Sequence, residues 1–392
     1  MFISLFGLVG CMTIASPLKV EPSMIISVPS IIQSLTFSSD GDIFAAGCTD
    51  GYVRLWNTDD GSVRLVKSAR RGPINALSFR PDGTRLALQT RENLKVWSTE
   101  TGVELLDIHA RGGEFIESIS YNADGSLLLS GVSTSEYDDD EPIDEGDVYH
   151  SEIYSAPNKK ERASILGVLR LWDAGSGAIK RNIYLFNKTV TVNTYRSPSN
   201  ESSDSDGVLA SSVLSDDNDY SDTVLATLYE GYNRMANKTI FSPDGMQIAA
   251  SFNNGDVKVY TLNGALIAEF HNKRRASTIA FSPDGKRLAI GFDNGNIIIY
   301  NIEERKMRLL QRHYKKITAL VYSPDGSFLV SASTDATIRF WNASRGKEEI
   351  GTIRNHRKII TALAYAPNGE RLVSADSDKT VKIWEIATLD LK

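Results

Sequence analysis

The feature that most constrains this chain is a short turn that recurs seven times, at intervals of 40 to 43 residues with one gap of 120. In its clearest copy, an alternating apolar run ends at Tyr322, and Ser323-Pro324-Asp325-Gly326 then reverses the chain. Proline fixes φ at the second turn position, and glycine takes the positive φ that would strain other residues. The seven turn glycines are separated by 42, 42, 120, 40, 41 and 43 residues: Gly41, Gly83, Gly125, Gly245, Gly285, Gly326 and Gly369. Self-similarity of this kind predicts an array of equivalent supersecondary units.

Each unit reads as short β-strands around that turn. Ile317, Ala319 and Val321 alternate with smaller or polar neighbours before the turn, as a half-buried strand requires. A third strand in each unit ends with a large aromatic residue: Trp56, Trp97, Trp172, Tyr260, Tyr300, Trp341 and Trp384. Units of about 40 residues with four short strands match the period of propeller blades. We therefore predict an all-β fold.

The turn and the closing aromatic together resemble the WD-repeat β-propeller family over residues 23–387. The dipeptide that names the family occurs only at Trp172-Asp173. The resemblance implies a seven-bladed β-propeller with four-stranded antiparallel blades. Met24–Val28 is a lone strand before the first unit, and Val381–Ile386 is a third strand with no outer strand after it. Because unpaired edges are unfavourable, we expect the N-terminal strand to complete the last blade and close the ring.

Residues 1–22 form an apolar N-terminal tail whose first eighteen residues carry no charge. They could act as an export leader, and Leu8-Val9-Gly10-Cys11 resembles a bacterial lipoprotein box. The positively charged start of a signal peptide is missing, however. We therefore expect a cytoplasmic protein, and an exported or lipid-anchored one if residues 1–18 act as a leader. Glycine, serine, threonine and proline interrupt the apolar run, which disfavours a membrane span.

Two acidic segments interrupt the repeat in its 120-residue gap. Residues 131–167, inserted in blade 3, hold ten acidic and three basic residues; the Ser-rich segment 190–235, before blade 4, holds eight and two. Composition of this kind disfavours an independent core, so we expect mobile insertions. The whole chain has a net charge of −6, so the remaining propeller body is basic. The insertions are therefore expected to mask a basic face in part.

Two of the last units carry Ser, His, Asp and Trp in a common register. The residues are His313, Ser331, Asp335 and Trp341 in one unit, and His356, Ser374, Asp378 and Trp384 in the next. Each set could be taken for a hydrolase triad. The family resemblance instead implies a structural tetrad, in which a loop histidine bridges Asp and Ser, and Ser meets the indole N–H. The serines fall inside strands rather than on a sharp turn, which favours the structural interpretation.

Basic residues cluster just before several innermost strands. In a propeller these segments are blade-to-blade loops, and all of them open on one face. Solvated polar loops and a positive binding platform are both compatible with this pattern. The candidate partner-binding residues are Arg70, Arg71, Lys273, Arg274, Arg275, Arg312, Lys315, Lys316, Arg354, Arg357 and Lys358.

The family resemblance implies an interaction scaffold without catalysis, with other proteins as partners and a monomer within a larger complex. Binding of nucleic acid or phosphorylated ligands through the basic face is one alternative. An exported propeller enzyme is another. No cofactor is expected, because the chain has no Gly-rich phosphate loop and no cysteine pair for zinc. The acidic run from Asp138 to Asp147 lacks the ligand spacing of a calcium loop.

Overall fold

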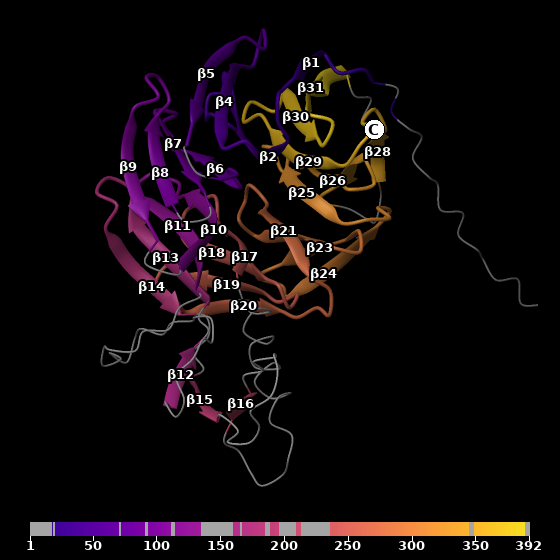
Figure 1. The fold of residues 1–392 in the computed structure, drawn as a ribbon. Helices are drawn as coiled ribbons and strands as arrows, with labels where there is room; N and C mark the ends of the chain where they lie inside the picture. Colours follow the sequence, from indigo (N-terminus) through magenta and orange to yellow (C-terminus); the bar gives the residue numbers. More distant parts are fainter. Residues whose placement is uncertain are drawn as a thin grey trace, which may run out of the picture.

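The described residues of the computed structural model form seven four-stranded antiparallel sheets arranged in a ring (Figure 1). The described ranges are 18, 20–69, 72–90, 93–110, 114–134, 160–164, 167–184, 189–195, 209–212, 236–344 and 349–388. Of the possible leader, residues 1–18, all but Leu18 lie outside them. The all-β, seven-bladed fold predicted from the repeated turn is confirmed.

Each blade begins with a strand at the inner rim of the ring and proceeds outward strand by strand. The innermost strands are β2 (Ile32–Phe37), β6 (Ala76–Phe79), β10 (Glu114–Tyr121), β17 (Ala236–Phe241), β21 (Ala276–Phe281), β25 (Ile317–Tyr322) and β29 (Ile360–Tyr365). The second strands are β3 (Ile43–Cys48), β7 (Arg85–Gln89), β11 (Leu127–Thr134), β18 (Gln247–Phe252), β22 (Arg287–Phe292), β26 (Phe328–Ser333) and β30 (Arg371–Asp376).

The third strands carry the closing aromatics, and the fourth strands form the outer rim. The third strands are β4 (Tyr52–Asn57), β8 (Asn93–Ser98), β13 (Gly167–Asp173), β19 (Val257–Thr261), β23 (Asn296–Asn301), β27 (Ile338–Asn342) and β31 (Thr380–Glu385). The outer strands are β5 (Val63–Ser68), β9 (Glu104–His109), β14 (Ile179–Tyr184), β20 (Leu266–Phe270), β24 (Lys306–Gln311), β28 (Glu349–Ile353) and β1 (Met24–Ser27).

The hydrophobic core lies between neighbouring blades rather than within any one of them. Ile299 of β23 and Trp341 of β27, from adjacent blades, belong to one buried cluster. All seven closing aromatics are less than a tenth exposed. A blade therefore buries its faces only against its neighbours, which is the physical reason for a closed ring.

The chain closes the ring through β1, as predicted. Met24 pairs with Ile383 and Ser27 with Thr380, so the N-terminal strand is the outer strand of the last blade. The preceding residue Leu18 donates its backbone N–H to the Thr352 carbonyl at 2.9 Å, so contact extends to β28. A short 3₁₀ turn, η1 (Ile386–Thr388), follows β31.

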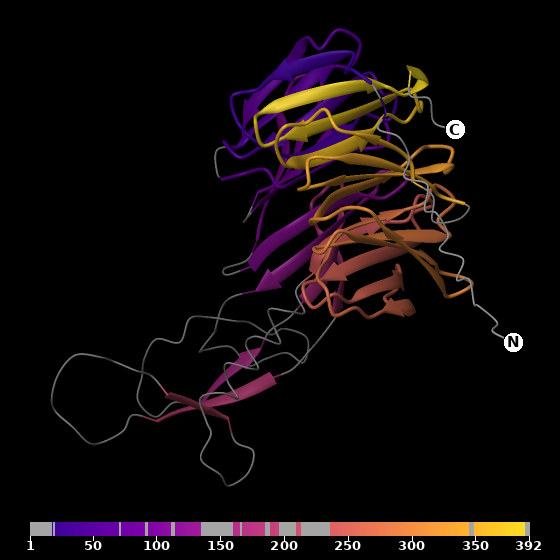
Figure 2. The same cartoon turned by 90° about the vertical axis from the view of Figure 1, so that its right-hand side faces the viewer.

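The two insertions contribute strands that their composition does not predict. β12 (Lys160–Ser164) comes from the first, and β15 (Thr189–Tyr195) and β16 (Leu209–Ser212) from the second. They pair in the antiparallel order β12-β15-β16, and Figure 2 shows this sheet outside the ring. The β-branched run Thr189-Val190-Thr191-Val192 favours a strand despite the surrounding polarity. Residues 131–134 and Gly167, at the two ends of the first insertion, belong to β11 and β13 of blade 3, and the remaining residues of the insertions lie outside the described residues.

The repeated turn is held by its own polar side chains. In blade 6 the Ser323 hydroxyl donates to Asp325 Oδ1 at 2.6 Å and accepts the Phe328 backbone N–H at 2.9 Å. Gly326 has a φ of 69°, the left-handed value expected at this position. The hydrogen bond from Ser323 lowers the pKa of Asp325. Within the described part of the chain, no helix is long and apolar enough to cross a membrane.

Removal of β1 should destabilise the ring, whereas removal of the residues before Leu18 should not. Deleting residues 1–17 keeps the pairing with β31, and deleting residues 1–30 exposes the β31 edge. We expect the shorter deletion to unfold at the wild-type urea midpoint and the longer one to aggregate, as measured by chemical unfolding and light scattering. A soluble 31–392 protein with the wild-type transition would contradict the role of β1.

Acid should weaken the turn at Asp325. A carboxyl whose pKa is lower in the folded state contributes stability above its unfolded pKa, about 3.9, and loses it as pH falls through the folded value. Substitution of Ser323 by Ala removes the main cause of that lowering. We expect an NMR titration to show a higher Asp325 pKa in Ser323→Ala than in wild type. An unchanged Asp325 pKa would show that the hydroxyl does not stabilise the carboxylate.

Candidate functional site

In blade 6 a chain of hydrogen bonds joins four buried side chains. The Trp341 indole N–H donates to Ser331 Oγ at 2.8 Å, and Ser331 Oγ lies 2.7 Å from His313 Nε2. On its other side, His313 Nδ1 lies 2.8 Å from Asp335 Oδ2. Donors and acceptors match along the chain if the Ser331 hydroxyl donates to Nε2 of a neutral imidazole and Nδ1–H donates to Asp335. The structure thus brings together the four residues predicted for this blade.

Burial and hydrogen bonding set the charge states of this network. Burial lowers the pKa of His313, against the opposing effect of its hydrogen bond to Asp335. Burial alone would raise the pKa of Asp335, but hydrogen bonds from His313 and Thr337 outweigh it and lower that pKa. The Asp335 carboxylate also accepts the backbone N–H of Tyr314 at 3.2 Å. The network therefore fixes the loop between β24 and β25.

In blade 7 the carboxylate differs from the one that the spacing predicts. His356 Nδ1 lies 2.7 Å from Asp376 Oδ2, whereas the predicted partner, Asp378, is exposed and donates its backbone N–H to Asp376 Oδ1 at 3.0 Å. Asp376 ends β30 opposite Ile360, the place that Ser333 occupies opposite Ile317 in blade 6. A serine there is too short to reach the histidine, so the turn residue Asp335 does so in blade 6. An aspartate there reaches the histidine directly.

The remaining members of the blade 7 network are those predicted. His356 Nε2 lies 2.7 Å from Ser374 Oγ, which accepts the Trp384 indole N–H at 2.9 Å. Ser374 and Ser331 are both 0% exposed. A hydroxyl that no substrate can reach, and that already accepts an indole N–H, cannot serve as a nucleophile. The Ser–His–Asp sets are thus structural despite their resemblance to a triad.

A third Trp–Ser pair escaped the sequence analysis. In blade 3 the Trp172 indole N–H donates to Ser130 Oγ at 2.9 Å. The first insertion separates these two residues by 42 positions, so the spacing to the tryptophan hides the pair. The turn glycine would have revealed it, because Ser130 follows Gly125 by five residues, as Ser331 follows Gly326.

Sequence reasoning also missed a row of cations inside the blades. The residue two before the closing aromatic is basic in six blades, and five of these residues are buried: Arg54, Lys95, Arg170, Arg339 and Lys382. Most of them meet a carboxylate: Arg54 Nη2 lies 2.7 Å from Asp50 Oδ2, and Arg339 Nη1 lies 2.6 Å from Glu349 Oε1. Buried charges need such partners. Their constant position, two residues before the closing aromatic, could have revealed these cations from the sequence.

Most of the predicted partner-binding cations lie on the blade-to-blade loops and are exposed. Exposed are Lys273, Arg274, Arg275, Lys315, Lys316, Arg354, Arg357 and Lys358. Burial, and then the nearby guanidinium of Arg275, lower the pKa of Lys316, so the loops that precede β21 and β25 place like charges close together.

Three of the predicted cations do not belong to this exposed set. Arg312 is half-buried, and its Nε lies 3.8 Å from Glu349 Oε2. It therefore supports blade 6 instead of facing a partner. Arg70 and Arg71 lie outside the described residues.

One group of side chains has the proximity of metal ligands. In blade 4 the ligand atoms of Asp256, Glu269 and His271 lie within 4.8 Å of one another. A hydrogen bond to Asp256 raises the pKa of His271, and Lys258 Nζ lies 2.7 Å from Glu269 Oε1. The Lys258 ammonium already neutralises the Glu269 carboxylate, and His271 Nδ1 is already paired with Asp256 Oδ1 at 2.8 Å. The group is better suited to ion pairs than to a metal.

Seven four-stranded antiparallel blades define a seven-bladed β-propeller. The WD domain, G-beta repeat model matches residues 23–57, 304–342 and 347–385, and the anaphase-promoting complex subunit 4 WD40 domain model matches residues 239–311. Together with the Trp–Ser–His–Asp networks in blades 6 and 7, these matches identify the chain as a member of the WD-repeat β-propeller family.

Similar proteins come from yeast and plants. The SIR4-interacting protein SIF2 of Saccharomyces cerevisiae is 25% identical over 260 residues, which cover 59% of this chain and 46% of SIF2. The small ribosomal subunit protein RACK1y of Oryza sativa subsp. japonica is 29% identical over 108 residues, or 26% of this chain and 32% of that protein. RACK1 of Brassica napus is 30% identical over 120 residues, or 26% and 36%. The chain spans less than half the length of these relatives.

Loss of the Asp376 carboxylate should destabilise blade 7 far more than loss of Asp378. Asp376→Ala leaves the buried His356 Nδ1 and Thr380 Oγ1 without their acceptor, which costs about 1–3 kcal/mol. Asp378→Ala is its matched control, because exposed substitutions usually change stability by less than about 0.5 kcal/mol. Urea unfolding of both variants tests this difference. Equal midpoints would contradict the stabilising role of the Asp376 carboxylate.

Proposed function

We propose that this propeller is a non-catalytic interaction scaffold that binds other proteins on its blade-to-blade loop face. Its relatives support a role in assemblies, since one is described as interacting with SIR4 and others as ribosomal subunit proteins. We place this activity in the cytoplasm. We infer the class of partner from the chemistry of the loop face.

The observation that carries the proposal is a pair of exposed apolar side chains among the loop cations. Tyr314 is 81% exposed beside Lys315 and Lys316, and Ile359 is 45% exposed beside Lys358. Aromatic and apolar anchors contribute most of the binding energy in protein interfaces, and surrounding charges steer the encounter. The chemistry fits an acidic protein segment with an apolar anchor residue.

The tetrads support this surface by fixing its loops. The side chain of His313 is fully buried beneath Tyr314, and Asp335 holds both His313 and the Tyr314 backbone. In the next blade His356 precedes the exposed Arg357 and Lys358 in the same way. A loop held before binding loses less conformational entropy on association. The buried networks thereby contribute to recognition without touching the partner.

Nucleic acid is the second candidate ligand, because eight exposed cations share this face. The net charge of −6 and the apolar anchors favour protein instead. An exported enzyme is less favoured, because the Ser–His–Asp sets in the described blades are buried.

The proposal predicts that partner capture depends on the loop face. A Tyr314→Ala, Lys315→Glu, Lys316→Glu variant should lose most of the proteins that wild type captures from its native cells, as measured by quantitative mass spectrometry with and without nuclease. The matched control is Lys286→Glu, Lys306→Glu, which reverses two exposed cations on turns of the opposite face.

The control should retain the wild-type partners, and nuclease should not release them. Loss of partners in both variants, or in neither, would contradict the assignment of this face. Release by nuclease, with binding that weakens steeply as salt rises, would favour the nucleic-acid alternative.

A further inference from the structure

Blade 4 differs from the other six blades in the side chain at one position of its innermost strand. Three residues before the aromatic that ends each innermost strand, the other blades place a small side chain. These small residues are Ser34, Ala76, Ser118, Thr278, Ala319 and Ala362. Blade 4 places Lys238 there, and the pairing confirms its register, since Lys238 lies opposite Ser251 as Thr278 lies opposite Gly291.

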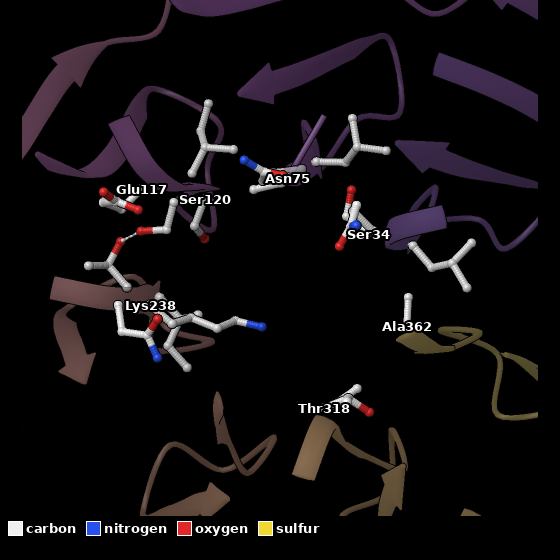
Figure 3. Close-up of a pocket in the computed structure, with 18 of the residues that line it drawn as sticks. Ser34, Asn75, Glu117, Ser120, Lys238, Thr318 and Ala362 are labelled. Carbon is white, nitrogen blue, oxygen red and sulfur yellow. Dashed lines mark hydrogen bonds between the residues drawn. The ribbon is translucent and has the colours of Figure 1, made fainter. Parts of the chain in front are cut away.

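Lys238 extends into the central channel. The innermost strands enclose a cavity of about 310 Å³ there, and Figure 3 shows the Lys238 side chain reaching from β17 into it, with its nitrogen toward the middle. Burial alone lowers the pKa of Lys238, with no contribution from a nearby charge. Among the described residues, no carboxylate forms an ion pair with it. Its charge is therefore uncompensated within this part of the protein.

Polar residues also line this cavity. The hydroxyl oxygens of two of them, Ser34 and Thr318, make no hydrogen bond to another described residue, but they are fully buried and do not face the open space. Glu117 is the carboxylate of the described lining; it is exposed and has an interaction of its own. Buried polar groups are nearly always satisfied, by protein, water or ligand. The Lys238 ammonium offers hydrogen-bond donors to an acceptor in the channel.

We propose that the central channel binds a phosphate-class oxyanion, with the Lys238 ammonium as its counter-charge and hydrogen-bond donor. A water molecule occupies about 30 Å³ in the liquid, so the cavity has room for one small anion with its waters. It is too small for folded nucleic acid. The group could arrive as free phosphate or as the phosphoryl group of a short peptide. The channel could bind this anion whether or not the loop face binds proteins.

Thermal unfolding of the full chain tests the site. Inorganic phosphate and the peptide acetyl-Gly-phosphoserine-Gly-amide are titrated against sodium chloride of equal ionic strength. A ligand that binds only the folded state raises Tm in a saturable way. We expect such a rise in wild type and in the surface control Lys286→Met, and at least a tenfold loss of affinity in Lys238→Met. Lys238→Arg should retain binding, and the tighter of the two ligands identifies the source of the phosphate group.

A second measurement covers the case in which Lys238→Met does not fold. An anion in contact with the ammonium stabilises its charged form, so NMR titration of wild type should show the Lys238 pKa rising when the tighter ligand is added. Saturable shifts of equal size in Lys238→Met and Lys286→Met would overturn the proposal. So would the absence of any shift beyond that of chloride in wild type, or a Lys238 pKa that the ligand leaves unchanged.

Discussion

Pairing of β1 with β31 joins the two ends of the chain in one sheet, and the rest of the structure depends on it. An open array of blades would leave a backbone edge at one end and an uncovered apolar face at each end. Closure removes both at once, and it makes each inter-blade core depend on the next. The ring then holds its loops and its channel in fixed positions, because no blade can shift without opening a buried cluster such as that of Ile299 and Trp341.

The number of blades and their register could be predicted because those features use local chemistry. A turn such as Ser323–Gly326 needs glycine at positive φ, and Trp341 marks the strand that the core covers. Ring closure could also be predicted from the sequence, because an extra strand precedes the first unit and the last unit lacks its own outer strand. The sheet β12-β15-β16 did not follow, because long-range pairing between two polar insertions leaves no periodic signal beyond the β-branched run that begins at Thr189.

The polar sites were predicted less completely because several residues compete for the same partner. Asp376 and Asp378 lie two positions apart, and only the end of β30 decides which carboxylate reaches His356. The buried cations such as Arg339 look like solvent-facing residues in an alternating strand until the Glu349 carboxylate of the neighbouring strand is placed beside them. Lys238 is conspicuous only after the innermost strands are aligned, because each carries a bulge or a short start that obscures the common position.

The loop face and the channel share an entrance, and this couples their electrostatics. Every innermost strand begins at a blade-to-blade loop, and Lys238 is the third residue of β17, so it lies within about 10 Å of that face along the strand. Exposed cations such as Lys316 already repel Arg275 there. An anion in the channel would reduce the positive potential that an acidic partner meets, so each ligand would weaken the other by the same factor.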